Sequence, residues 1–380
     1  MTDFGLQGQL SYALDHVNYV NAPLLPGALG DLYDSGPVLE VSMSLWSNAL
    51  GRSARAQQQQ ARQAGLAERH GARMQSLSAQ VQAESAYWRL VTARQAVGIQ
   101  REALGQAQAI HDYVQKKARM KLGEASDTLQ ASGLVALRRL ALKGAQSEEQ
   151  AALKAFNTAQ GRPQEEAAGE LEPLPYAQLV ALQVPDQRPG ERADVVAAQA
   201  QAALAQAAAR VDEERNKPTL EAFGTYAMSA RGADADSSER ALRAGDHDAT
   251  TVGLRFSAPL DVVSSYKARA GARLAAQSQQ EQFQQKLAQQ DADWKLLVQQ
   301  IRDIQESVAL AGQLVDAQTA KLADARERLK DGRATTYEVL SYEQDQSQAQ
   351  LQGLQLAAQL LSLRASLRLY PADGPAQAAD

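Results

Sequence analysis

Four short stretches of the chain alternate between apolar and polar residues with a period of two. Such alternation is typical of a β-strand that turns one face to an apolar environment and the other to water. Each stretch approaches the ~9–11 residues that a tilted strand needs to cross a bilayer. The apolar positions are Phe4, Leu6, Leu10, Tyr12 and Leu14; Leu39, Val41, Met43 and Leu45; Leu220, Ala222, Tyr226 and Met228; and Val252, Leu254 and Phe256.

The stretches form two pairs, joined by residues 15–37 and 229–250. Both links are long and polar, as are the outer loops of outer-membrane barrels. Phe223 breaks the alternation, because it stands at a polar position. The alternation alone is equally compatible with a half-buried sheet in a soluble sandwich.

The rest of the chain is predicted to be helical. Residues 47–121 and 264–330 contain no proline, and return helices are expected over 126–160 and 335–369. In the second long stretch apolar residues recur every seventh position, which indicates a seam packed with coiled-coil geometry. These residues are Leu287, Trp294, Ile301, Val308, Val315, Leu322 and Leu329.

An internal two-fold repeat follows from the order of these elements. Each half runs strand, long loop, strand, very long helix, glycine turn and return helix. The segments Ala54-Arg55-Ala56 and Ala268-Arg269-Ala270 occupy equivalent places, as do residues 119–123 and 328–332.

The second half also has a helix, predicted at 194–215, before its first strand. No equivalent precedes Phe4, and neither a basic start nor an apolar segment of a signal peptide is present. We therefore expect this sequence to be truncated at its N-terminus.

The amino-acid composition excludes several classes of function for this protein. The chain has 39 basic and 44 acidic residues and a net charge of -5, which argues against nucleic-acid binding. Without cysteine it has no disulfide or thiolate metal site. No nucleophile elbow, phosphate loop or paired carboxylates suggest an enzyme, and no cofactor is expected. The histidines, none with a partner at metal-ligand spacing, are His16, His70, His111 and His247.

Three ordered segments resemble the TolC-like outer-membrane efflux family. Residues 192–199, continuing through Lys217-Pro218-Thr219-Leu220, are similar to its helix-to-strand entry. Residues 256–260 are similar to its strand-to-helix exit, and residues 332–340 to the turn of its helical hairpin. The resemblance covers almost the whole chain.

This resemblance implies an α+β membrane protein with long antiparallel helical hairpins, whose strands join a trimeric β-barrel. Three protomers would each give four strands to the barrel, and their helices would form a tube across the periplasm. The implied function is a passive exit duct in the outer membrane, contacting lipid and working with a periplasmic adaptor and an inner-membrane pump. The alternative is a periplasmic adaptor or another soluble coiled-coil interaction protein.

The resemblance also implies site residues. Glu338 and Asp127 are candidates for acidic rings at a periplasmic tip gate, although both also suit a helix N-terminus, where the macrodipole favours acids. An adaptor would dock at the turns, near Gly123, Gly332 and Arg333. Glu221 and Arg255, at polar strand positions, are expected to line the barrel lumen or to form a cross-strand pair. Trp46 is a candidate for an interfacial aromatic belt.

The expected domain boundaries follow the elements. The segments are 1–46 for the first β-hairpin, 47–160 for the first helical hairpin, 161–191 for an irregular equatorial connector, 192–216 for a short helix, 217–262 for the second β-hairpin, 263–370 for the second helical hairpin and 371–380 for a disordered tail.

Overall fold

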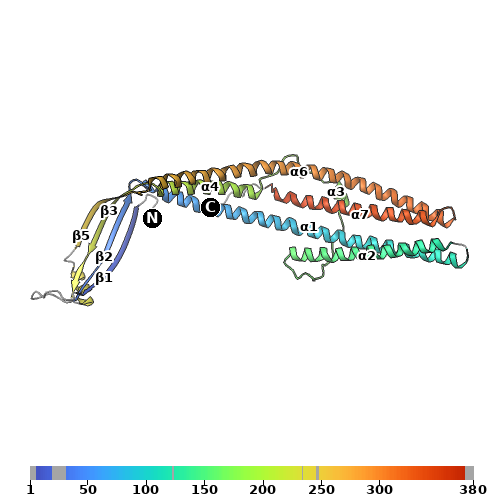
Figure 1. The fold of residues 1–380 in the computed structure, drawn as a ribbon, viewed down its shortest axis with the longest axis horizontal. Helices are drawn as coiled ribbons and strands as arrows, with labels where there is room; N and C mark the ends of the chain where they lie inside the picture. Colours follow the sequence, from blue (N-terminus) through green and yellow to red (C-terminus); the bar gives the residue numbers. More distant parts are fainter. Residues whose placement is uncertain (1–5, 19–30, 122–123, 233, 245–247, 373–380) are drawn as a thin grey trace, which may run out of the picture. The chain divides into compact units, whose positions relative to one another are not determined.

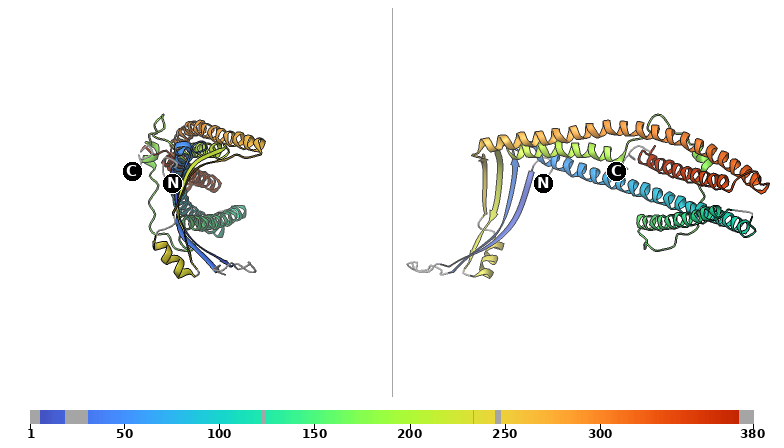
Figure 2. Two further views of the ribbon diagram at one scale, coloured as in Figure 1. Left: turned by 90° about the vertical axis from the view of Figure 1, so that its left-hand side faces the viewer. Right: turned by 45° about the vertical axis from the view of Figure 1, so that its right-hand side comes forward.

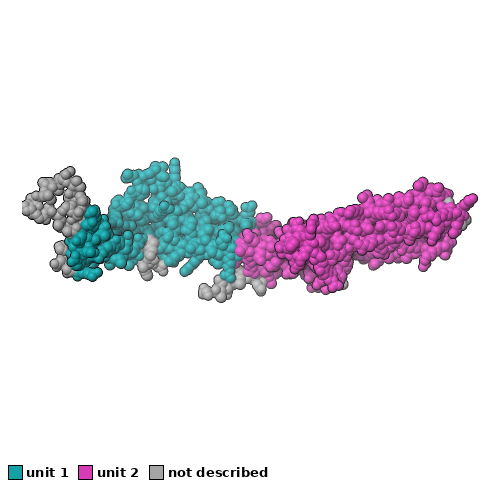
Figure 3. Space-filling view, turned by 90° about the horizontal axis from the view of Figure 1, so that it is seen from below, with its two compact units in different colours: residues 1–69, 196–286 teal, residues 70–195, 287–380 magenta. Residues whose placement is uncertain are grey.

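The structure is a computed structural model that describes residues 6–18, 31–121, 124–232, 234–244 and 248–372. It divides into two compact units (Figure 3). Unit 1 comprises Met1–Arg69 and Val196–Lys286, and unit 2 comprises His70–Val195 and Leu287–Asp380. The two longest helices, α1 and α6, contribute residues to both units.

Unit 1 contains an antiparallel sheet with the strand order β1-β2-β3-β5 (Figure 1). The two hairpins that the sequence predicts, β1–β2 and β3–β5, are joined by pairing between β2 and β3. A short strand, β4, also pairs with β2. The strands are β1 (Leu6–Asn18), β2 (Asp31–Ser44), β3 (Thr219–Met228), β4 (Ala230–Gly232) and β5 (Asp248–Ser257).

The predicted links differ from the observed structure. Pairing of β1 with β2 extends beyond Leu14 to Asn18↔Asp31, inside the segment that we expected to be loop. Residues 229–250 contain β4, the start of β5 and helix α5 (Ala235–Ala244), which lies at the end of the sheet away from the long helices (Figure 2). Asp234 caps this helix, since its Oδ1 accepts from the Ser237 amide at 2.7 Å. The polar composition of the link concealed that helix.

The register brings the apolar positions of all four long strands to one face. Leu10, Leu39 and Tyr226 lie opposite one another, and so do Met43, Ala222 and Leu254. This face is exposed within the chain: Leu10 is 75 % and Val252 81 % accessible. The alternation therefore reflects one continuous apolar surface, which none of the described residues of unit 1 covers.

Helices α1 (Arg52–Arg119), α4 (Ala193–Arg215) and α6 (Val262–Lys330) continue unit 1 beyond the strands. Helix α4 buries small side chains, among them Ala202 and Ala207, and small residues let helices approach closely. Its polar side faces α6, where Glu213 pairs with Arg273.

Unit 2 contains two helical hairpins. Helix α1 is followed by α2 (Ala125–Ala159), and α6 by α7 (Thr336–Ser366) and a final 3₁₀ turn, Leu367–Leu369. The predicted seam is confirmed in α6, where Trp294, Ile301, Val308 and Leu322 are buried.

The connector 161–191 is largely irregular, as predicted, but it contains the short helix α3 (Tyr176–Val180). It also contributes Leu174 and Leu179 to the main hydrophobic core of unit 2. Among the described residues, no helix has the length and apolarity required to cross a membrane.

Candidate functional site

A charged cluster lies on the polar face of the sheet. Arg255 Nη1 lies 3.8 Å from Glu40 Oε1 and 3.9 Å from Glu221 Oε2. Glu221 and Arg255 are directly opposite in the register, so the predicted cross-strand pair is present. Glu40 stands at a polar strand position in the sequence, but its proximity to Arg255 depends on the pairing of β2 with β3.

Phe223, which breaks the alternation, belongs to this cluster. The Arg255 guanidinium lies 4.8 Å from the centre of its ring. The ring lies against Gly253, where an added Cβ would come within 2.8 Å of Phe223 Cζ. The glycine therefore makes room for the ring, and the cationic group above it is favourably placed over the π-face.

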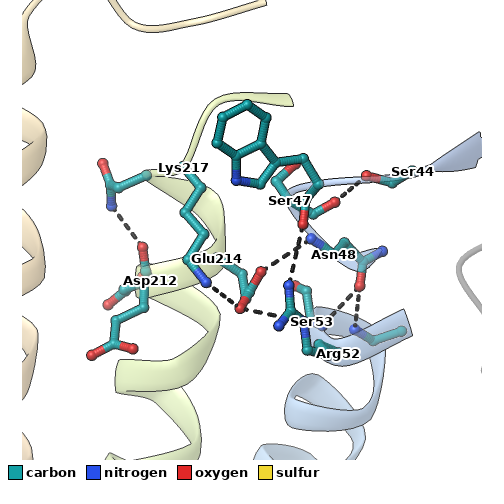
Figure 4. A network of polar contacts seen from close by, with 12 residues as sticks. Ser44, Ser47, Asn48, Arg52, Ser53, Asp212, Glu214 and Lys217 are labelled. Atoms are coloured by element: carbon teal, nitrogen blue, oxygen red, sulfur yellow. Dashed lines mark hydrogen bonds and ion pairs between the residues drawn. The ribbon is translucent and has the colours of Figure 1, made fainter. Parts of the chain in front are cut away.

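The junction between β2 and α1 is held by Asn48 (Figure 4). Its backbone is left-handed, with φ of 60°, a conformation that asparagine tolerates better than most residues. The Asn48 Oδ1 accepts from the amides of Ser53 at 2.7 Å and Ala54 at 3.2 Å, which satisfies the first turn of α1. The backbone amide of Asn48 donates to Glu214 Oε2 at 3.2 Å.

Glu214 ties this junction to the end of α4. Its carboxylate lies 2.6 Å from Lys217 Nζ and 3.7 Å from Arg52 Nε (Figure 4). Burial opposes its ionisation, but the bonds from Lys217 and the Asn48 amide outweigh this effect and lower the pKa of Glu214. One ionised carboxylate therefore links the junction from β2 to α1 with the junction from α4 to β3.

The turn between α6 and α7 has a well-defined glycine C-cap. Gly332 has φ of 73°, and the Arg333 amide donates to the Arg328 carbonyl at 2.8 Å while the Gly332 amide donates to Leu329 at 3.1 Å. This is a Schellman motif, which requires a left-handed residue at the Gly332 position. The Arg333 side chain is exposed and pairs with Asp331.

Glu338 forms a capping box at the start of α7. The Glu338 amide donates to Thr335 Oγ1 at 3.2 Å, and the Glu338 carboxylate accepts from the Thr335 amide at 3.4 Å. Asp127 lies in the first turn of α2, in the other hairpin. Both acids thus lie in the first turn of a helix, where the helix macrodipole favours a negative charge, as the sequence analysis expected. Gly123 lies outside the described residues; before it, Lys121 is left-handed with φ of 58°.

A buried ionic group near the same turn was missed by sequence reasoning. Glu343 is 3 % exposed, and its Oε1 accepts from Arg326 Nη2 at 2.9 Å. Burial raises the pKa of Glu343, although Arg326 and Arg138 favour its ionised form. Arg138, on α2, is itself buried. Glu343 follows Val339 by four residues, so the two side chains lie on the same face of α7, and that face is buried. This helical spacing is the feature of the sequence that could have indicated a buried carboxylate.

The raised pKa of Glu343 predicts a pH-dependent difference from Glu343→Gln. The ionised form is disfavoured in the folded state, so its free-energy cost disappears as the pH falls through the folded-state pKa. The melting temperature of the wild type, relative to that of the variant, should therefore rise as the pH falls toward the ordinary pKa of glutamate, about 4.3. Asp345→Asn, which removes a half-exposed carboxylate from the same helix, is the control. A difference independent of pH would contradict the raised pKa.

The segment that resembles the family's helix-to-strand entry has a clear structural role. Arg192 donates to both carboxylate oxygens of Asp194, at 2.9 and 2.7 Å, and to Asp293 at 2.8 Å. Its amide donates to Gln290 Oε1 at 2.8 Å, and its guanidinium lies 5.9 Å from the Tyr370 ring. The bond to Asp194 raises the pKa of Arg192 despite its burial. One arginine therefore ties the connector to α6 and to Tyr370, which follows the 3₁₀ turn after α7.

The histidines give no metal site among the described residues, where no group of potential ligands is arranged to hold an ion. His16 stacks on Tyr33 with ring centres 4.3 Å apart, and His111 lies 3.5 Å from Asp112. His247 lies outside the described part of the chain.

No protein-family model matches the chain, and no curated protein sequence matches it. Solved structures do. The outer-membrane channel OprN is 18 % identical, with a TM-score of 0.72 over 96 % of this chain and 80 % of its own. VceC from Vibrio cholerae, an outer membrane protein, is 17 % identical, with a TM-score of 0.75 over 96 % and 87 %. The Campylobacter jejuni CmeC outer membrane channel is 15 % identical, with a TM-score of 0.74 over 97 % and 78 %.

At these identities the likeness establishes the fold. The chain has the fold of solved outer-membrane channels, which is the fold that the resemblance to the TolC-like family implied. These solved structures are therefore of membrane proteins and not of enzymes.

Proposed function

We propose that this chain is one subunit of a homotrimeric exit duct in the outer membrane, which conducts its cargo passively. The single observation that carries the proposal is the exposed apolar face of the sheet, on a fold that solved outer-membrane channels share. Apolar surface of this extent is unfavourable in water and favourable against lipid.

The sheet also has two open edges. Strands β1 and β5 each have one neighbour in the described sheet. In a hydrocarbon environment unpaired backbone groups cost several kcal/mol each, so an edge strand must pair or the sheet must close. Pairing β5 of one copy with β1 of the next closes a barrel, and three copies give the trimer that the resemblance implied.

In such a barrel the opposite face of the sheet lines a water-filled lumen. That face carries the Glu40–Arg255–Glu221 cluster with Phe223 beside it. Charged side chains here stay hydrated, which fits a passage for polar cargo. We propose that a periplasmic adaptor docks at the turn of Gly332 and Arg333 and at the equivalent turn of the first hairpin, and that an inner-membrane pump supplies the cargo.

The soluble alternative, a periplasmic adaptor, is disfavoured by the same observation. Its strands would form a small sandwich with apolar residues turned to a core. Here Leu10, Val252 and Leu254 are each more than two-thirds exposed.

Reconstitution in planar bilayers tests the proposal. The purified protein should require detergent, should crosslink as a trimer and should produce discrete conductance steps. A monomer that remains in solution without detergent and produces no steps would overturn the proposal.

We propose further that Glu338 contributes to a charged ring at the tip, in addition to capping α7. Glu338→Gln separates these roles, because glutamine at this position retains a capping box but removes the charge. In the bilayer assay this variant should weaken block by multivalent cations, and its melting temperature should fall only slightly, through the lost charge at the helix N-terminus. Glu338→Ala should weaken the block and also cost about 0.5–1.5 kcal/mol of stability, because the carboxylate that accepts from the Thr335 amide is lost while the Thr335 cap remains. Unchanged cation block in both variants would leave Glu338 with its capping role alone.

A further inference from the structure

A basic pocket lies where the sheet meets the helices in unit 1. It has a volume of about 290 Å³ and is formed by the first two turns of α1 and the last turns of α4. The charged residues around it are Arg52, Arg55, Arg210, Glu213 and Glu214.

The carboxylates of this pocket are already neutralised. Glu213 pairs with Arg273 at 2.5 Å, and Glu214 pairs with Lys217 and Arg52. In the described part of the chain, Arg55 and Arg210 are exposed and have no carboxylate partner. The pocket therefore has an excess of positive charge, concentrated in two arginines from different helices.

The position of the pocket relative to the sheet is fixed by Trp46. This side chain is 49 % exposed and belongs to the second residue after the end of β2. Exposed tryptophan at the end of a membrane strand is typical of the level of the lipid headgroups. Arg52 Nη2 donates to the Trp46 carbonyl at 3.3 Å, so the pocket begins at that level.

The depth of the pocket also matches a headgroup layer. Arg52 and Arg55 are one turn apart, about 4.5 Å along the axis of α1. The polar layer on each side of the hydrocarbon core is about 5–8 Å thick. In the proposed duct, with α1 leaving the bilayer along its normal, both arginines would fall within the layer that contains lipid phosphates.

We propose that this pocket binds the phosphate of an anionic phospholipid, with Arg55 and Arg210 as its principal ligands and Arg52 at its rim. Guanidinium groups bind phosphate oxygens through paired, charge-assisted hydrogen bonds, which an isolated ammonium cannot reproduce. The proposal rests on the membrane position of the sheet in the proposed duct. It adds a specific lipid to a surface that would otherwise contact the bilayer only through apolar side chains.

The test measures lipid binding by the detergent-solubilised protein. Short-chain phosphatidylglycerol should raise the melting temperature of the wild type, whereas phosphatidylcholine with the same chains should not. The double variant Arg55→Gln/Arg210→Gln should bind phosphatidylglycerol about a hundredfold more weakly, since each of the two lost charge-assisted bonds contributes about tenfold in affinity. Arg62→Gln/Arg69→Gln removes two exposed arginines further along α1 and should bind like the wild type.

Two results would overturn the site. One is equal affinity of the double variant and the wild type for phosphatidylglycerol. The other is an equal rise in melting temperature with inorganic phosphate, which would indicate a site for soluble anions. If the double variant does not fold, Arg55→Lys/Arg210→Lys retains the charges and should bind more weakly than the wild type. If the wild type conducts in planar bilayers but binds phosphatidylglycerol no better than phosphatidylcholine, the lipid site is refuted and the duct is not. If the wild type does not conduct, the duct itself is refuted.

Discussion

Leu254→Arg is expected to abolish assembly of the protein in the outer membrane, whereas Thr251→Arg on the same strand is expected to be tolerated. Leu254 lies on the apolar face of β5, opposite Ala222, and is 69 % exposed. An arginine facing lipid near the bilayer midplane costs about 2–4 kcal/mol in a membrane barrel, and a trimer incurs this cost three times.

Thr251 is the matched control because it lies on the other face of β5, opposite Thr225. An arginine there would face the water-filled lumen, beside charges that are already present. The measurement is the amount of each variant recovered as trimer from outer-membrane fractions of cells that express equal amounts of protein. Normal assembly of Leu254→Arg together with failure of Thr251→Arg would reverse the assignment of the two faces.

Arg192→Ala is expected to destabilise unit 2 strongly. The side chain is 15 % exposed and makes ion pairs with Asp194 and Asp293, and its removal deletes both pairs. Breaking a fully buried pair by removing one partner costs about 3–5 kcal/mol and an exposed pair contributes about 0–1 kcal/mol, so this half-buried group should cost about 2–3 kcal/mol. The variant should therefore melt at a temperature several degrees lower than the wild type, in the same detergent.

The control for Arg192 is Arg302→Ala. Arg302 pairs with Asp186 in the same unit, but the two side chains are 58 % and 81 % exposed. Exposed pairs of this kind contribute about 0–1 kcal/mol. Comparable losses of stability in the two variants would show that the half-buried ion pairs of Arg192 stabilise the fold no more than an exposed pair does.

The strand and helix elements could be predicted because each leaves a local signal. The alternation around Leu39 and Leu254 and the seven-residue seam through Ile301 are periodicities of single segments. The pairing of β2 with β3 joins residues almost two hundred positions apart, and no local pattern encodes it. The same holds for α5, whose polar sequence was compatible with either a loop or a helix.

The candidate site was predicted to a similar extent. Glu221 and Arg255 were placed together from their polar parity, and the pair between them is present. Glu338 was taken from the family resemblance, and its role at a gate stays a prediction. Glu40 and Arg138 were not found, because their roles arise from contacts between elements distant in the sequence. Phe223 was visible as an exception to the alternation, but its explanation required Gly253 on the neighbouring strand.

The two open edges of the sheet have a genetic consequence. In the proposed trimer, each copy completes the hydrogen bonding of its neighbour, so one defective edge prevents the whole ring from closing. If equal amounts of normal and edge-defective protein mix at random, about one-eighth of the trimers contain three normal copies. A mutation that damages β1 or β5 would therefore be dominant over a normal gene in the same cell.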